Sequence, residues 1–287
     1  MSWVITGSQK NKGLLDEFTG AAAAYSLRNL SLLQNPYVVR VRRSNDNTEQ
    51  DFTAIEVSDG TLAAWVGAGN NGFVRTWYDQ SGNSRDMQQA TAAYQPQIVS
   101  SGVLITEGGK PALLTTNSST MALTSAIGLS SHSVFMAIQS AVEITQLSRQ
   151  DLWRSDNPTA DIFSFGPTTA SLTDERLSWL TVESSIVYGF GQVANNYAAG
   201  KYLISAIWNG TLASVFFNSS SQSLTASSSG GGFTSTIYAR FFQRLLGTSS
   251  GTAGYSGKVF EFCLYPSNQS SNRTAIEANI NAHYSIY

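Results

Sequence analysis

The feature that most constrains this chain is that its apolar residues come in short alternating runs separated by turn-forming residues. Such runs occur at His132–Ile138, Tyr202–Trp208, Leu212–Phe217, Ile237–Leu246 and Lys258–Tyr265. A period of two over so few residues is typical of half-buried β-strands. No run approaches the roughly 18 consecutive apolar residues that a membrane-spanning helix needs. The pattern therefore predicts an all-β protein.

One strand and one turn stand out within this pattern. Phe260, Phe262 and Leu264 alternate along their run, so we expect them to share a face in the core. Asn209-Gly210 follows the run that ends at Trp208, and this pair can take positive φ at both central positions of a turn. We therefore expect a tight type I′ hairpin there.

Two segments show helical spacing instead. Apolar residues recur through 14–33 at roughly helical intervals, which predicts a helix at the edge of the domain. Near the end of the chain, Ile276, Ile280 and Tyr284 recur every four residues and predict a closing helix with one buried stripe. Ser267 or Ser270 is expected to cap that helix.

Length and composition bound the domain organisation and the partners. The 287 residues suit one large β domain, which we place at 14–287 after a polar arm at 1–13. Charged residues are 13% of the chain, about half the usual share, and the net charge is −2. Because nucleic-acid binding needs a concentrated positive surface, we expect no nucleic acid as a partner. We also expect no membrane partner.

The cysteine and histidine content argues against a cofactor. Cys263 is the single cysteine, so no internal disulfide forms, and its apolar surroundings predict a buried thiol. His132 and His283 lie far apart in the sequence, which argues against zinc. We expect no metal and no other cofactor. Calcium at Asp79, Asn83 and Asp86 is the less favoured alternative, because the spacing matches no known loop.

The sharpest local motif is Trp77-Tyr78-Asp79-Gln80-Ser81-Gly82-Asn83. Trp77, Tyr78, Asp79, Gln80 and Asn83 are the candidate carbohydrate-binding residues, with an aromatic platform for the sugar ring and polar groups for its hydroxyls. The favoured alternative is structural: Asp79 and Asn83 tie down a turn while an aromatic ring fills the core.

Charged residues elsewhere have structural and functional interpretations. Arg42 and Arg43 with Asp46 and Asp51 form either an ion-paired structural unit, which we favour, or a carboxylate-binding site. Glu261 lies between two phenylalanines, where a catalytic role is the less favoured alternative. We expect it to face solvent or to pair with Lys258 or an arginine.

A series of motifs in the first half resembles a known family. The segments Ala24–Arg28, Val39–Asp46, Thr76–Asn83 and Gln95–Val99 are similar, in order, to the N-terminal part of the catalytic domain of the α-L-arabinofuranosidase B family. The resemblance covers about residues 20–115. It implies a concanavalin A-like jelly-roll β-sandwich, and the helical patterns add an N-terminal helix and a short C-terminal helix.

The second half resembles laminin-G-like and concanavalin-like lectin modules. The resemblance covers about 130–287 and rests on Lys201–Asn218, Tyr255–Asn268 and the ending Ala282–Tyr287. Such modules are common in virion and adhesion proteins of bacteriophages, so the resemblance implies a non-catalytic surface role.

The chain departs from the arabinofuranosidase family at its chemistry. The family carries adjacent cysteines and a Phe-Asp-Tyr-Gly-Asn segment in its sugar pocket, and this chain has neither. A glycosidase needs two carboxylates placed across the scissile bond. No motif assigns either role to the acids of the middle region, so no catalytic residue is carried over; these acids are Asp151, Asp156, Asp161, Asp174, Glu175 and Glu183.

Three functions follow as hypotheses. The first is a non-catalytic structural protein on a bacteriophage virion surface (head decoration, fibre or tail-associated), binding glycans in one version. The others are a glycoside hydrolase of the arabinofuranosidase type and a soluble lectin. Since Met1–Gly7 does not begin a signal peptide, we expect synthesis in a host cytoplasm and release with the virion. Expected partners are capsid or tail proteins through residues 1–13, cell-surface glycans, and further copies of the chain in a homo-oligomer.

Overall fold

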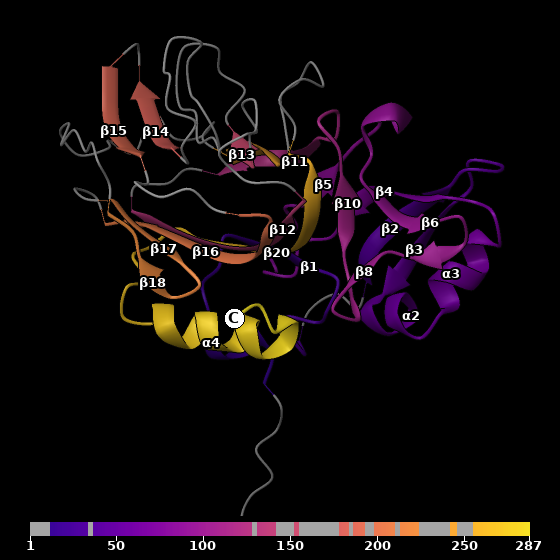
Figure 1. The fold of residues 1–287 in the computed structure, drawn as a ribbon, viewed down its shortest axis with the longest axis horizontal. Helices are drawn as coiled ribbons and strands as arrows, with labels where there is room; N and C mark the ends of the chain where they lie inside the picture. The colour runs from indigo at the N-terminus through magenta and orange to yellow at the C-terminus, as the bar shows by residue number, and fades with distance from the viewer. Residues whose placement is uncertain are drawn as a thin grey trace, which may run out of the picture.

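The protein is described from a computed structural model (Figure 1). The described residues are 12–33, 37–127, 131–141, 152–154, 178–183, 186–192, 198–209, 213–223, 242–245 and 255–287. The first eleven residues of the expected arm lie outside them, as do the runs 224–241 and 246–254.

The described part is an all-β sandwich in which every strand pairing is antiparallel. Sixteen strands form one continuous sheet, and two two-stranded sheets, β14-β15 and β8-β9, stand apart from it. The strands of the first half are β1 (Ala23–Ser26), β2 (Tyr37–Arg43), β3 (Glu49–Thr53), β4 (Gly72–Trp77), β5 (Met87–Gln88), β6 (Gln97–Ser100), β7 (Val103–Leu104), β8 (Thr106–Glu107), β9 (Lys110–Pro111) and β10 (Leu113–Thr115). The remaining strands are β11 (Met121–Ile127), β12 (His132–Ser140), β13 (Trp153–Arg154), β14 (Ser178–Glu183), β15 (Ile186–Gln192), β16 (Gly200–Trp208), β17 (Ala213–Phe217), β18 (Ser220–Ser221), β19 (Phe242–Leu245) and β20 (Gly257–Tyr265).

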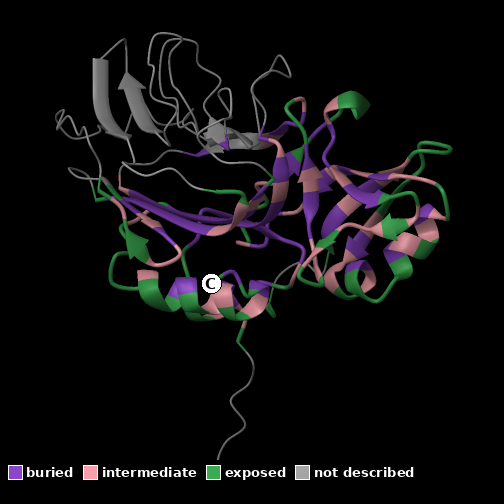
Figure 2. Ribbon diagram, in the orientation of Figure 1, coloured by how far each residue is buried: buried purple, intermediate pink, exposed green. Residues whose placement is uncertain are grey.

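Two hydrophobic clusters lie on the two faces of the layer formed by β20, β12, β16 and β17. The inner cluster lies between this layer and the β5-β11 layer, and it includes Met136, Ile204 and Met121. The outer cluster lies between the same layer and the C-terminal helix, and it includes Phe135, Leu203 and Ile280. Figure 2 shows β12, β20 and most of β16 coloured as buried, whereas β17 is buried only in part. Its strands are apolar on both faces because both faces are covered.

The helices are few and short. They are α1 (Leu14–Glu17), α2 (Ala54–Ser58), α3 (Thr61–Val66), a 3-10 turn at Ala92–Tyr94, and α4 (Arg273–Tyr284). α2 begins at a capping box, in which the Thr53 hydroxyl accepts from the Glu56 amide and the Glu56 carboxylate accepts from the Thr53 amide. Among the described residues, no helix has the length and apolar character needed to cross a membrane.

The expected helix over 14–33 is wrong. Helix α1 ends at Glu17, Gly20 has a φ of 86°, and Ala23–Ser26 forms β1 against β20. Both faces of β1 are buried. Tertiary pairing with β20 therefore overrides the helical propensity of the alanine run, because the strand buries these residues on both faces.

The closing helix is confirmed, with one difference at its start. Helix α4 buries Ile276, Ile280 and Tyr284 as the periodicity predicts. It begins after Asn272, so neither Ser267 nor Ser270 is the N-cap, and Asn272 makes no side-chain capping bond. Figure 1 shows α4 lying across the outside of the β12-β16-β20 layer.

The expected shared face of Phe260, Phe262 and Leu264 is partly wrong. All three are buried, but Phe260 belongs to the outer cluster while Phe262 and Leu264 belong to the inner one. The register along β12 shows why: Ala137 pairs with Glu261 and Ile138 with Val259, so β20 carries one extra residue. This β-bulge moves Phe260 to the face that α4 covers.

The hairpin between β16 and β17 is confirmed, but its register differs from the expected turn. Trp208 pairs with Ala213. A two-residue turn centred on Asn209 and Gly210 would pair Trp208 with Thr211 instead, so the expected type I′ geometry is not the one adopted. Residues 210–212 themselves lie outside the described residues.

Replacing Ile280 by alanine tests the contribution of α4 to the fold. Ile280 is fully buried in the outer cluster. We expect Ile280→Ala to lower the free energy of unfolding by about 2–5 kcal/mol, because it leaves a cavity in a packed core. Urea denaturation measures this change. The exposed Ala282→Ser on the same helix is the control, with an expected change within about 0.5 kcal/mol; equal losses in both variants would contradict the packing described here.

Candidate functional site

The aromatic residues of the predicted carbohydrate-binding motif serve the core and an ion pair. Trp77 is fully buried, and its ring centroid lies 5.6 Å from that of Tyr25. The half-buried Tyr78 donates its hydroxyl to Asp51 over 2.6 Å. Trp77 therefore offers no platform to a sugar ring.

The polar residues of the motif hold the backbone of 21–30. The buried Asp79 carboxylate accepts amide hydrogens from Ala24, Ser81 and Arg85 at 2.9–3.1 Å. These bonds occupy both oxygens that a calcium ion would need. Among the described residues, no three histidine, cysteine, aspartate or glutamate side chains lie close enough to hold a metal ion.

Gln80 and Asn83 bind the same segment. Gln80 accepts from the Leu30 amide at 2.8 Å and donates to the carbonyls of Ser26 and Arg28 at 3.0 Å. Asn83 donates to the carbonyls of Ala21 and Ala22. The geometry thus matches the structural interpretation of the motif, and sugar contact through Tyr78 and the exposed Asn83 stays a prediction.

Two of the three arginines of β2 form ion pairs, and one of these pairs differs from the expected pairing. Arg43 pairs with Asp46 at 2.7 Å, as expected. Asp51 pairs with Arg40 at 2.8 Å rather than with Arg42. Arg42 instead donates to Gln95 and Asn47. No free arginine cluster remains here to bind a carboxylate ligand.

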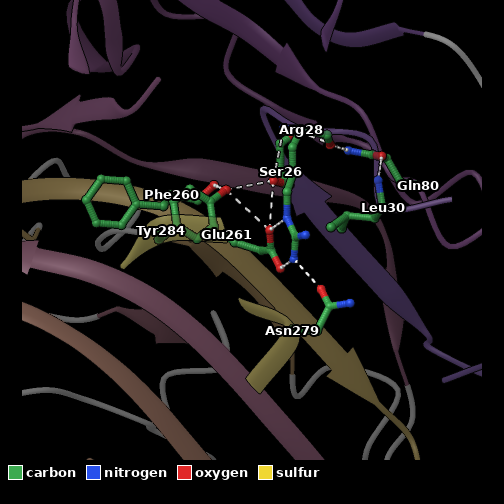
Figure 3. A network of polar contacts seen from close by, with 8 residues as sticks. All are labelled: Ser26, Arg28, Leu30, Gln80, Phe260, Glu261, Asn279 and Tyr284. Carbon is green, nitrogen blue, oxygen red and sulfur yellow. Dashed lines mark hydrogen bonds and ion pairs between the residues drawn. The ribbon is translucent and has the colours of Figure 1, made fainter. Parts of the chain in front are cut away.

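The structure reveals a buried polar network that the sequence motifs did not indicate (Figure 3). Arg28 donates two hydrogen bonds to the Glu261 carboxylate, from Nε at 2.7 Å and from Nη2 at 2.9 Å. Nη2 also donates to Asn279 of α4 at 2.9 Å. Ser26 donates to Glu261, and the Tyr284 hydroxyl lies within hydrogen-bond distance of both residues.

The electrostatics of this network favour the charged form of Arg28. Glu261 is completely buried, so its carboxylate depends on its partners for stabilisation. Burial alone lowers the pKa of Arg28, but the charge and hydrogen bonds of Glu261 outweigh it and raise that pKa above its usual range. Glu261 therefore pairs with an arginine, as one of the expectations held, and does not face solvent or pair with Lys258. Lys258 binds Glu107 at 2.7 Å.

A cleft of about 310 Å³ opens beside this network. Residues from the end of β1, α2, β9 and α4 surround it, and they are Leu27, Arg28, Asn29, Ala54, Ile55, Ser58, Gly109, Lys110, Pro111, His283 and Tyr284. We call it the α2–α4 cleft. Arg28 and Lys110 bring positive charge to it, and none of its surrounding residues is acidic.

His283 in this cleft is neutral at ordinary pH. Burial, together with the positive charges of Arg28 and Lys110, lowers the pKa of His283 to about 4, against a smaller opposing effect of Glu261. A neutral imidazole both donates and accepts a hydrogen bond. The α2–α4 cleft thus combines fixed positive charge, uncharged polar groups and apolar walls.

Two other clefts in the described part of the chain offer less chemistry. One of about 270 Å³ contains Asp16, whose carboxylate already binds Ser31, Leu32 and Gly13. The other, of about 470 Å³, contains Arg85, which donates to the Ala22 carbonyl. None of these three clefts is surrounded by two carboxylates.

The acids considered for catalysis lie mostly outside the described residues. Glu183 is the last residue of β14, and its side chain is not part of the described structure. The other five acids lie at 151, 156, 161, 174 and 175, outside the described ranges. Within those ranges, Glu261 is held by Arg28 and is not available as a general acid or base.

Three known structures that superimpose on this chain are arabinofuranosidases. The chain superimposes on two structures of a GH54 α-L-arabinofuranosidase with a TM-score of 0.65 and 11% and 12% identity; one is a variant soaked with 4-nitrophenyl α-L-arabinofuranoside, the other is soaked with a cyclic sulfate inhibitor. A third structure, an arabinofuranosidase complexed with arabinofuranosyl-α-1,2-xylobiose, superimposes with a TM-score of 0.55 and 15% identity.

Each superposition covers 94% of this chain and 64% of the known chain, so the protein spans less than two thirds of those enzymes. No protein-family model matches the sequence. Comparison with curated protein sequences finds no significant match either. At this level of identity the likeness establishes the class of fold: the protein is a β-sandwich of the kind found in arabinofuranosidases, over nearly the whole chain rather than residues 20–115 alone.

The sequence carried only a faint signal for the Arg28–Glu261 pair. Both residues stand inside short apolar segments, where an unpaired charge is costly and a partner is required. The two are 233 positions apart in the chain. Only the pairing of β1 with β20 identifies them as partners.

Removing Arg28 tests how much the structure depends on this pair. We expect Arg28→Ala to lower the free energy of unfolding by about 3–5 kcal/mol, because it leaves the Glu261 carboxylate buried without its partner. Adding Glu261→Gln should restore part of that loss. In the control, Glu49→Gln breaks the looser pair with Arg75 at 3.7 Å, and its expected cost is below about 1 kcal/mol. Chemical denaturation that gave the same loss for Arg28→Ala and Glu49→Gln would contradict the assigned role.

The two histidines provide a pH test. Burial lowers the pKa of His132 to about 3, and that of His283 is lowered to about 4. Because the unfolded chain takes up these protons at higher pH, near 6.5, the free energy of unfolding should fall as pH drops from about 7 toward 4. NMR titration of the imidazole signals, assigned with His283→Asn, measures both midpoints. A midpoint of His283 above pH 6 would contradict the cleft described here.

Proposed function

We propose that this protein recognises carbohydrates, with polysaccharides that carry arabinofuranosyl side chains as the first ligands to test. The observation that carries the proposal is the superposition of 94% of the chain on α-L-arabinofuranosidases with a TM-score of 0.65. The low charge of the chain agrees with it, because sugar hydroxyls are met by uncharged polar groups and aromatic rings.

Hydrolysis is the second candidate function, and the same superposition favours it. It needs two carboxylates about 5–5.5 Å apart for retention or about 6.5–9.5 Å apart for inversion. The described clefts offer no such pair. The proposal of hydrolysis therefore rests on acids of the 151–183 region, whose side chains are not described.

Binding and turnover are separated in one experiment. We expect the purified protein to be retarded in gels that contain arabinan or arabinoxylan, compared with gels that contain unsubstituted xylan. We expect no release of nitrophenol from 4-nitrophenyl α-L-arabinofuranoside. The proposal would be contradicted if no polysaccharide retarded the protein in gels and no glycan on a broad array bound it.

Turnover, if found, would establish the hydrolase instead. It should then vanish with a single aspartate-to-asparagine or glutamate-to-glutamine change at one of the acids Asp151, Asp156, Asp161, Asp174, Glu175 and Glu183. Activity that survives all six changes would point to a contaminating enzyme. Matched changes at the exposed Asp59, which accepts only a local bond from Thr61, control for general effects.

The virion-surface role stays a hypothesis, because no comparison bears on it. It predicts that the protein is found in purified virus particles, contacting capsid or tail proteins through residues 1–13. Mass spectrometry of such particles tests it, and a variant that lacks residues 1–13 should no longer be incorporated. Detection only outside the particles would remove this role and leave the proposed carbohydrate recognition untouched.

A further inference from the structure

We propose that the α2–α4 cleft binds a sugar unit that carries a carboxylate, with Arg28 and Lys110 as the groups that receive it. This inference rests on the proposed carbohydrate recognition and names a ligand class for a site outside the predicted motif at Trp77–Asn83.

The guanidinium of Arg28 is fixed in position and keeps one donor group available for an anion. Its Nε and Nη2 groups are fixed by Glu261 and Asn279, while Nη1 has no protein partner among the described residues. The guanidinium also lies 5.8 Å from the centre of the Tyr284 ring. A guanidinium that is already immobilised loses little conformational entropy when it binds a carboxylate, so its free edge is a preorganised donor.

Lys110 supplies the charge that Arg28 cannot supply alone. Glu261 offsets the charge of Arg28, but Lys110 makes no ion pair within the part of the chain that the structure describes. No acidic residue surrounds the cleft, so its net charge is positive. Burial is the largest cause of the lowered pKa of His283, and the positive charges of Arg28 and Lys110 lower it further. An anionic ligand would be favoured over a neutral one of the same shape.

The uncharged polar groups suit sugar hydroxyls. Asn29 is exposed at the cleft and makes no hydrogen bond with the other described residues. The Ser58 hydroxyl donates to the Ala54 and Ile55 carbonyls, which leaves its oxygen free to accept. The neutral His283 can both donate and accept. A hydroxyl-bearing ligand can satisfy all three, whereas a simple inorganic anion cannot.

The apolar walls and the size suit one ring. Ile55 is 67% exposed at the cleft, and Leu27 and Pro111 also line it. The C–H face of a sugar ring would cover part of this surface. The volume of about 310 Å³ lies at the lower end of the range for small-molecule sites, about 300–1,000 Å³, which fits a single sugar unit.

The test uses two ligands that differ only in the carboxylate. Methyl β-D-glucuronide and methyl β-D-glucoside are titrated into the full chain, and the imidazole signal of His283 is followed by NMR with calorimetry for affinity. We expect the glucuronide to shift His283, with the glucoside at least about tenfold weaker. Lys110→Ala should weaken glucuronide binding about tenfold, because it removes a charge-assisted hydrogen bond. Lys12→Ala, a lysine that does not border the cleft, should bind as the parent does.

Several results with the two glycosides and the variants would overturn the inference. They are no shift of His283 with the glucuronide, equal binding of the two glycosides, and equal binding by Lys110→Ala. Acetate or sulfate binding as tightly as the glucuronide would also overturn it, since the site would then select charge and not a sugar. These outcomes are separate from the failure of the proposed function. Retardation by arabinan with no glucuronide binding leaves that function in place and rejects the inference. Glucuronide binding with no retardation by arabinan or arabinoxylan supports the inference and rejects the arabinofuranosyl polysaccharides as ligands.

Discussion

The structure depends on one buried ion pair, Arg28–Glu261, which lies where β1, β20 and α4 meet (Figure 3). Burying a carboxylate costs several kcal/mol unless partners compensate it. Here Arg28, Ser26 and Tyr284 all do so, and each comes from a different part of the chain from Glu261. The pair therefore specifies one arrangement of three elements, because any other arrangement leaves a charge unpaired in the core.

The β-bulge in β20 makes this pair geometrically accessible. One extra residue at Phe260 places Phe260 toward the helix α4, where its ring lies 5.3 Å from that of Tyr284. Glu261 then meets Ser26 across the β1 register. The same arrangement fixes Arg28 at the edge of the α2–α4 cleft, so the packing of the fold and the chemistry of the cleft share one residue.

What this protein shares with arabinofuranosidases is the fold. The fold is shared over nearly the whole chain at 11–15% identity. The motif Trp77–Asn83, which carried much of the sequence resemblance, binds the backbone of 21–30 and fills the core. In this chain the motif therefore serves the architecture, and it identifies the fold and not the ligand.

The sequence by itself determined the all-β class, the hairpin of β16 and β17, and the buried stripe Ile276–Tyr284, because local periodicity encodes them. Only the tertiary structure decided that Ala23–Ser26 is a strand, since its pairing partner β20 lies at the other end of the chain. The same holds for the bulge at Phe260, which no alternation reveals. It holds for the Arg28–Glu261 pair and the cleft beside it, because contacts across 233 positions leave no periodic trace in a single sequence.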